Sequence, residues 1–257
     1  LDATWFMPGS PRDARAEYAA AHIPGARFFD IDEIADHRSD LPHMAPTVEK
    51  FVARLRALGV GDGHQVVVYD AHGLMSAPRV WWTFRLMGKR DVAVLDGGLP
   101  KWKAEGRALT DEATAIRDRH LTVDRQHQLV RDVTEVARAS KLGDPQILDA
   151  RSAERFRGEV EEPRPGLRRG RIPGSLNLPF GAVLNPDGTM KSPADLRAAM
   201  EGAGVDLDRP VITTCGSGIT AAVLFLALER AGARDLALYD GSWAEWGMFG
   251  DSPVEIG

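Results

Sequence analysis

The sequence predicts an α/β protein of two tandem domains, each with a parallel β-sheet that is flanked by helices on both faces. Three observations support this prediction. Short runs of β-branched residues alternate along the chain with stretches in which apolar residues recur with the period of a helix. Strands that alternate with helices form parallel sheets covered on both faces. The same order of motifs occurs twice within the 257 residues, which suffice for two ordinary domains.

The first copy begins in a strand at residues 1–4. Further strands are expected at residues 65–69 and 92–95, and helices at 14–21, 47–58, 76–87 and around Trp102. Thr47 has the side chain of an N-cap, and Gly88 is placed to end the helix that precedes it. Residues 106–130 are polar and carry no period, so they indicate a linker.

The pattern then returns. Residues 148–150 repeat the Leu-Asp-Ala of residues 1–3, and Ile172-Pro173-Gly174 repeats Ile23-Pro24-Gly25. Trp246 repeats Trp102 in the same way. Two long copies indicate a duplicated domain and not a solenoid. We therefore expect a first domain at 1–112, a linker at 113–130 and a second domain at 131–257.

The single cysteine, Cys215, follows the β-branched run 211–214 and precedes a helix expected at 221–230. Gly216 and Gly218 allow the backbone to curl, so that successive N–H groups point inward at one spot. A thiolate there is stabilised by those donors and by the positive end of the helix. The arrangement predicts a nucleophile, and a buried, inert cysteine is the alternative.

The repeat places Asp70 at the position of Cys215. A carboxylate cannot carry out thiolate chemistry, so the first domain is expected to be non-catalytic. It acts as a scaffold or supplies groups to a site in the second domain.

Composition narrows the classes of partner and compartment. The net charge of −5 favours neither nucleic acid nor an anionic membrane, and no apolar run approaches the roughly 20 residues of a membrane span. One cysteine excludes an internal disulfide and suits a reducing, cytoplasmic compartment. Because Leu1 lies inside an expected strand, we expect residues upstream of it, and a targeting segment among them remains open.

With these residues the sequence resembles the tandem-domain rhodanese-like sulfurtransferases, over essentially the whole chain. The resemblance rests on both Ile-Pro-Gly turns, the first copy without a cysteine, the segment 239–243 and the loop 215–220, Cys-Gly-Ser-Gly-Ile-Thr. This loop looks like that of the branch that uses 3-mercaptopyruvate. Members that use thiosulfate typically carry basic residues directly after the cysteine, where this chain has Gly216 and Ser217.

The resemblance also implies substrate-binding residues. Arg155 and Arg164 resemble the two substrate arginines of the family, and planar guanidinium forks fit a carboxylate beside a ketone. The loop would contribute further contacts to the substrate, from Gly216, Gly218, Ile219 and Thr220. The nearby Arg168 and Arg169 are expected on a solvated loop face.

A proton relay is implied as well. Asp32 would hold the imidazole of His43, and His43 would poise the hydroxyl of Ser217 for proton transfer to the departing pyruvate enolate. As alternatives, Ser217 serves loop hydrogen bonding and Asp32 is a helix N-cap. The histidines without such context, His22 among them, are expected at the surface.

The implied reaction is a two-step sulfur transfer through a Cys215 persulfide, with no metal or organic cofactor. Since the chain has no second cysteine, the acceptor is external: thioredoxin, a small thiol or cyanide. Three alternatives remain. The first is a thiosulfate sulfurtransferase, which has the same architecture. The second is a cysteine phosphatase or arsenate reductase, but these enzymes need an arginine at the end of the loop, where this chain has Ala221. The third is a non-catalytic binding module, in which Cys215 would have no chemical role.

Overall fold

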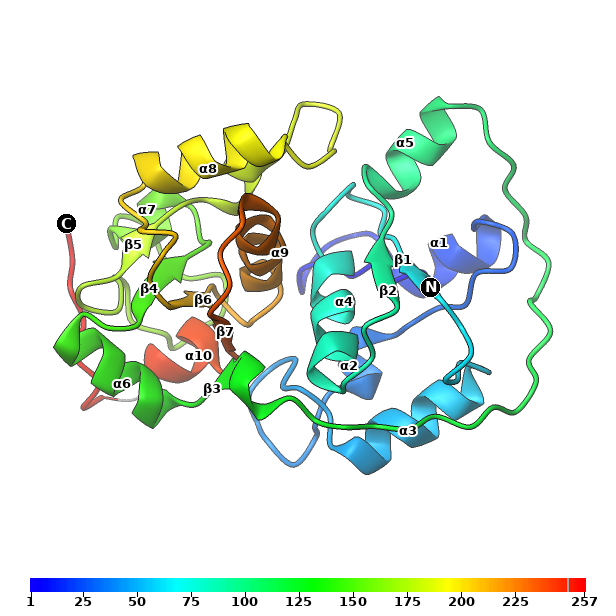
Figure 1. The fold of residues 1–257 in the computed structure, drawn as a ribbon, viewed down its shortest axis with the longest axis horizontal. Coiled ribbons are helices and arrows are strands. Elements are labelled where there is room, and N and C mark those ends of the chain that lie inside the picture. Colours follow the sequence, from blue (N-terminus) through cyan, green and yellow to red (C-terminus); the bar gives the residue numbers. More distant parts are fainter. Residues whose placement is uncertain (249) are drawn as a thin grey trace. The chain divides into compact units, whose positions relative to one another are not determined.

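The computed structural model describes residues 1–248 and 250–257, and the chain forms two compact units (Figure 1). The first comprises Leu1–Asp36, Ala45–Gln126 and Pro186–Thr189, and the second comprises His37–Met44, His127–Asn185 and Met190–Gly257. The segment His37–Met44 therefore belongs to the second unit, although its place in the sequence lies in the first expected domain. The boundaries at 112 and 131 remain a prediction, which limited proteolysis would test.

The first unit contains a small parallel sheet, in which β1 (Val66–Val68) pairs with β2 (Val92–Val94). Asp2 adds parallel bridges to Phe28 and Tyr69. The helices of this unit are α1 (Ala14–Ala20), α2 (Ile31–Ile34), α3 (Val48–Ala57), α4 (Ala77–Leu86) and α5 (Gly98–Ala104). The other strands and the helices expected here are confirmed within one or two residues, whereas the strand expected at residues 1–4 is reduced to the isolated bridges of Asp2, and α2 was not foreseen.

Local chemistry explains where these helices begin and end. The carboxylate of Asp13 accepts two backbone N–H groups at the start of α1, and Thr47 accepts the N–H of Lys50 at the start of α3. Gly88 follows α4 with φ +89°, a conformation in which glycine carries no Cβ penalty. The predicted N-cap at Thr47 is therefore confirmed, whereas the C-cap of α4 is Met87 and Gly88 lies one residue beyond it.

The second unit contains a five-stranded parallel sheet in the order β3-β7-β6-β4-β5. Its strands are β3 (Val130–Arg131), β4 (Gln146–Asp149), β5 (Leu176–Asn177), β6 (Val211–Thr214) and β7 (Leu236–Tyr239). Its helical segments are η1 (His127–Leu129), α6 (Val133–Leu142), α7 (Ala153–Phe156), η2 (Phe180–Val183), α8 (Pro193–Gly202), α9 (Ala221–Ala231) and α10 (Ser242–Trp246). The α/β class with parallel sheets flanked by helices is thus confirmed.

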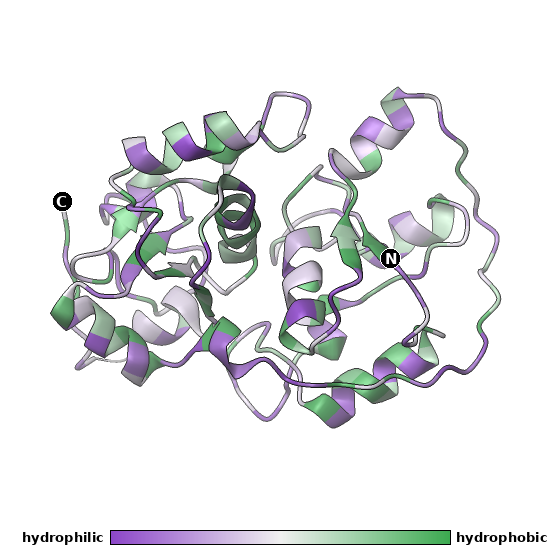
Figure 2. Cartoon of the chain, in the orientation of Figure 1, coloured by the Kyte–Doolittle hydropathy of each residue, from purple (hydrophilic) through white to green (hydrophobic). Residues whose placement is uncertain are grey.

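Helices cover both faces of the five-stranded sheet (Figure 1). On one face, Val136 and Ala139 of α6 pack with Trp243 and Trp246 of α10 against apolar strand residues. On the other face, α9 packs on β6 and β7, with α8 beside it. Eight of the eleven residues of α9 are buried, and Figure 2 shows the helix as largely hydrophobic. The central strand β6, which leads to Cys215, is buried along its whole length.

The polar segment 106–126 follows the surface of the first unit without forming a helix or strand. Thr110 and His22 exchange two backbone hydrogen bonds of 2.8 and 2.9 Å, and the carboxylate of Asp62 accepts both the N–H and the hydroxyl of Thr122. His22 is only 1% exposed, so the expectation that it lies at the surface was wrong. Its ring stacks on that of Tyr18 in α1, with the ring centres 4.2 Å apart, and its Nδ1 lies 2.8 Å from the carbonyl oxygen of Tyr18.

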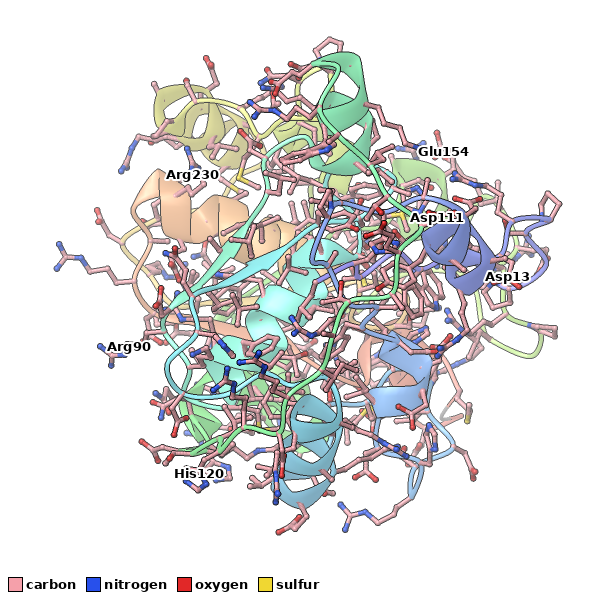
Figure 3. All side chains as sticks on the ribbon, turned by 90° about the vertical axis from the view of Figure 1, so that its right-hand side faces the viewer. Asp13, Arg90, Asp111, His120, Glu154 and Arg230 are labelled. Carbon is pink, nitrogen blue, oxygen red and sulfur yellow. The ribbon has the colours of Figure 1, made fainter. Side chains whose placement is uncertain are left out.

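The outer surface is charged. Figure 3 labels six exposed side chains, from Asp13, Arg90, Asp111, His120, Glu154 and Arg230. Across the residues that the structure describes, no helix combines the length and apolar composition needed to cross a membrane.

Candidate active site

Cys215 lies where β6 ends, at the start of the loop that leads to α9. The residue is 2% exposed, and its Sγ accepts the backbone N–H of Gly218 at 3.1 Å. Gly218 has φ +81°, which turns its N–H back toward the sulfur at no steric cost for glycine. An inward-pointing donor, as the loop sequence predicts, is therefore present at Gly218.

The first turn of α10 holds this loop from behind. The backbone N–H of Trp243 donates to the carbonyl of Cys215, and that of Ala244 donates to the carbonyl of Gly216, both at 2.9 Å. Because each peptide group is planar and trans, its N–H points opposite to its C=O. The N–H groups of Gly216 and Ser217 therefore point away from α10.

Ser242 supports the loop through a backbone conformation that is unusual for serine. It is fully buried with φ +51°. Its hydroxyl donates to the carbonyl of Tyr239 at 2.8 Å and accepts the N–H of Cys215 at 3.3 Å. The corresponding residue of the first unit is Gly98, with φ +52°. Serine thus replaces glycine in the copy that carries the cysteine.

We predict that Ser242→Ala lowers the free energy of unfolding by about 1–3 kcal/mol, because the N–H of Cys215 loses its buried acceptor while the positive φ persists. Ser242→Gly loses the same hydroxyl but relieves strain of about 1 kcal/mol or more, so it should be the more stable variant. Urea denaturation measures both. An alanine variant as stable as the glycine variant would contradict the assignment of strain.

The other loop residues enclose the sulfur without adding charge. Ser217 is 5% exposed and Ile219 is 3% exposed. Thr220 occupies the N-cap position of α9, and its carbonyl accepts the N–H of Val223 at 3.1 Å. The loop 215–220 thus contains no ionisable side chain except the thiol of Cys215.

Four charged side chains form a chain of ion pairs at the carboxyl end of β4. Nε and Nη2 of Arg151 donate to the carboxylate of Asp149 at 2.9 and 2.7 Å, and Nη1 donates to Glu162 at 2.8 Å. Glu162 also accepts from Nε and Nη2 of Arg155, at 3.2 and 2.5 Å. The side chains of Asp149, Arg151 and Glu162 are at most 2% exposed, whereas that of Arg155 is 22% exposed.

The charges of this ion chain compensate one another. Burial disfavours the charge on Arg151, but the carboxylates of Asp149 and Glu162 outweigh this effect and raise the pKa of Arg151. The guanidinium of Arg151 also lies 4.3 Å from the centre of the Trp243 ring. Of the four residues, only Arg155 was expected in the site. Glu162 stands in the same Glu-Glu-Pro-Arg segment as Arg164, which was the available signal.

Arg155, on α7, reaches the backbone beside Cys215. A Cβ atom built on Gly216 would lie 2.9 Å from Nη2 of Arg155. The guanidinium therefore occupies the space that a side chain at position 216 would need.

Arg164 contacts the imidazole of His43 within the same unit, with Nη2 at 3.0 Å from Nε2. Arginine can only donate, so Nε2 accepts, and a neutral His43 carries its proton on Nδ1. His43 is 7% exposed and has φ +61°. Substrate binding by Arg155 and Arg164 remains a prediction.

The predicted relay spans both units. Asp32 belongs to the first unit, where its Oδ2 accepts the indole N–H of Trp5 at 3.0 Å. Its alternative role as an N-cap was wrong, because Asp30 caps α2. His43 and Ser217 belong to the second unit, so a Ser217–His43–Asp32 relay stays a prediction.

In the first unit, the carboxylate of Asp70 stands at the position of the thiol and is fully buried. It accepts four backbone N–H groups at 2.8–2.9 Å, from His72, Met75, Ser76 and Ala77. Its carbonyl accepts the N–H of Leu99, as that of Cys215 accepts the N–H of Trp243. The loop of this copy therefore binds its own carboxylate.

Asp70→Asn should lower stability without removing chemistry. The amide group keeps one acceptor oxygen and leaves some of the four N–H donors unpaired, at about 1–3 kcal/mol each. We expect a lower melting temperature, with turnover per folded molecule within a few-fold of the parent. A loss of a hundredfold in a folded variant would show that Asp70 takes part in catalysis.

The expectation for the two neighbouring arginines is half right. Arg169 is exposed and lies 3.6 Å from Glu161. Arg168, expected on a solvated face, is half-buried and donates to the carbonyls of Trp246, Gly247 and Ser252. Long-range backbone acceptors, which the sequence does not reveal, fix its position. Within the described part of the chain, no group of three His, Cys, Asp or Glu side chains could hold a metal ion.

The model of the rhodanese-like domain matches this chain twice, at residues 12–105 and 132–248. The two matches cover most of the chain and include both copies of the repeat. The chain therefore belongs to the rhodanese-like family, as the motifs predict.

The relatives narrow this class. The 3-mercaptopyruvate sulfurtransferase of Escherichia coli strain K12 is 44% identical over 256 residues, which cover 99% of this chain and 91% of that protein. The crystal structure of SseA, described as one of the Escherichia coli 3-mercaptopyruvate sulfotransferases, superimposes with a TM-score of 0.86 and 42% identity, covering 94% of this chain and 91% of SseA. The thiosulfate sulfurtransferase of Bos taurus is 42% identical, covering 96% of this chain and 84% of that protein. Overall identity therefore does not separate the two sulfur donors, and the residues of the site must do so.

Proposed function

We propose that the chain transfers the sulfur of 3-mercaptopyruvate to an external acceptor through a persulfide on Cys215. One observation carries the choice of donor: Nη2 of Arg155 lies against Gly216, the residue that follows Cys215. A planar cation at that place suits a substrate that carries a carboxylate beside a ketone. The loop itself offers a thiosulfate dianion no charged side chain.

The proposed first step forms one bond and breaks one bond. The thiolate of Cys215 attacks the substrate sulfur, and the S–S bond of a persulfide forms as the C–S bond breaks. The bonding electrons leave with the three-carbon fragment, which is the enolate of pyruvate. A proton converts this enolate to pyruvate. Arg155 and Arg164 bind the substrate carboxylate and orient the substrate throughout this step.

The hydroxyl of Ser217 would donate this proton, with His43 poising the hydroxyl and Asp32 holding the imidazole of His43. Support for this relay is the burial of Ser217 two residues beyond the nucleophile. In the structure Nε2 of His43 accepts from Nη2 of Arg164, so the hydroxyl of Ser217 would gain this nitrogen only when Arg164 turns to the substrate carboxylate.

In the second step the outer sulfur leaves the enzyme. A thiolate attacks it, and the thiolate of Cys215 is restored. Because Cys215 is the single cysteine of the sequence, we propose an external acceptor, such as thioredoxin or a small thiol, with cyanide as a substitute in the assay. A cytoplasmic location belongs to the same proposal, and cell fractionation would test it.

Thiosulfate is the second candidate donor, since a thiosulfate sulfurtransferase matches the chain nearly as well as the relative from Escherichia coli. Pyruvate release from 3-mercaptopyruvate should be compared with thiocyanate release from thiosulfate and cyanide. We expect kcat/KM to be at least about tenfold higher with 3-mercaptopyruvate, equivalent to one charge-assisted hydrogen bond. A preference for thiosulfate would overturn the proposed donor.

A further inference from the structure

Glu162 joins two arginines that differ in their access to solvent. Arg151 is fully buried, and the same carboxylate binds Arg155, whose side chain is 22% exposed. Glu162 engages Arg155 through Nε and Nη2 together, so the plane of the guanidinium is fixed as well as its position. Three of the five N–H groups of Arg155 lie outside this fork.

The position of Glu162 is fixed in turn by the buried part of the ion chain. Asp149, the last residue of β4, accepts hydrogen bonds from two nitrogens of Arg151. The third nitrogen of this guanidinium donates a hydrogen bond to Glu162. The guanidinium of Arg151 stacks on Trp243, whose backbone N–H holds the carbonyl of Cys215. One rigid set of contacts therefore supports both Arg155 and the loop of the nucleophile.

The repeat provides an internal comparison. Asp2 corresponds to Asp149, and Thr4 stands where the second unit has Arg151. Thr4 binds Asp2 through its backbone N–H and its hydroxyl, so the local turn persists in the first unit. The arginine that extends the chain of charges is thus present in the copy with the cysteine and replaced by threonine in the copy with Asp70.

From this geometry we infer that Glu162 is a positioning residue for substrate recognition: it holds the guanidinium of Arg155 over Gly216, where the remaining N–H groups meet the carboxylate of the donor. Glu162 acts through Arg155 and does not touch the reacting sulfur. This inference rests on the proposed role of Arg155 in binding the substrate.

The main test is Glu162→Gln, which keeps one acceptor oxygen and removes the charge that completes the fork. The carboxylate contact is made in the ground state and in the transition state alike, so its loss raises KM and leaves kcat nearly unchanged. We expect KM for 3-mercaptopyruvate to rise by about tenfold or more, as for the loss of a charge-assisted hydrogen bond. Thiocyanate formation from persulfide-loaded enzyme and cyanide should stay at the parent rate, because no carboxylate is bound in that step.

A second variant covers the case in which Glu162→Gln fails to fold around the buried Arg151. Glu162→Asp keeps the negative charge beside Arg151 and withdraws the carboxylate from Arg155 by one methylene group. It should show the same rise in KM. Glu159→Gln is the matched control, because Glu159 binds Arg157 through the same fork at 2.6 and 2.8 Å but is exposed. Its kinetics should equal those of the parent.

A double-mutant cycle with Arg155→Ala decides whether Glu162 acts through Arg155. In that background Glu162→Gln should add no further rise in KM. An equal rise in both backgrounds, or a parallel loss in cyanide-dependent discharge, would show a general structural role and overturn the inference. If Arg155→Ala raises KM while neither Glu162 variant does, the inference fails and the proposed function stands. If Arg155→Ala leaves KM unchanged, the inference fails together with the proposed role of Arg155 in binding the substrate.

Discussion

Cys215→Ser is expected to abolish sulfur transfer from 3-mercaptopyruvate and from thiosulfate while leaving the fold intact. Serine is nearly isosteric with cysteine, and its hydroxyl accepts the N–H of Gly218 where Sγ does so now. A serine hydroxyl, however, does not ionise near neutral pH and forms no persulfide. With the nucleophile removed, neither step has a route, so turnover should fall to background.

Mass spectrometry after treatment with donor checks this result directly. The parent protein should gain one sulfur atom and the serine variant none, and circular dichroism should confirm that both are folded. Because the chain has one cysteine, no second thiol can complicate the measurement. An added sulfur on the serine variant would refute the assignment of Cys215.

Arg155→Lys and Arg164→Lys are each expected to lower kcat/KM for 3-mercaptopyruvate by about ten- to a hundredfold. Lysine keeps the positive charge but loses the planar, bidentate contact. A charge-assisted hydrogen bond contributes roughly 1.5–3 kcal/mol, which corresponds to this range. Arg155→Lys should show the larger loss, because lysine cannot form the fork to Glu162 that directs the side chain toward Gly216.

Thiosulfate provides the specificity control, since it has no carboxylate and its turnover should fall less. Arg157→Lys is the matched variant, because Arg157 also pairs with a glutamate but is exposed. Equal losses with both donors would mean that the arginines support the loop and do not bind the substrate carboxylate. Parent-like kinetics in both variants would place Arg155 and Arg164 outside the site.

The sequence alone determined the features that depend on local order. A buried β-branched strand, a cysteine that two loop glycines follow, and an apolar helix succeed one another along the chain, so the position of Cys215 between β6 and α9 was predictable. The duplication was readable for the same reason, since both copies keep their turns and strand ends. Register then identified Asp70 as the counterpart of Cys215, and the structure adds that its carboxylate binds four backbone N–H groups of its own loop.

Tertiary structure alone decided which charged groups share a buried site. Asp149 ends a strand, and Glu162 lies in the loop beyond α7, the helix that carries Arg155. Nothing in the spacing of these residues shows that Arg151 links the two carboxylates. Burying a charged side chain without an opposite charge beside it costs much free energy, so the folded chain brings opposite charges together. Arg168 was misplaced for the same reason, because its partners are carbonyls almost eighty residues away. Sequence patterns report periodicity and local turns, whereas the partners of a buried charge are selected when the ends of strands and helices converge.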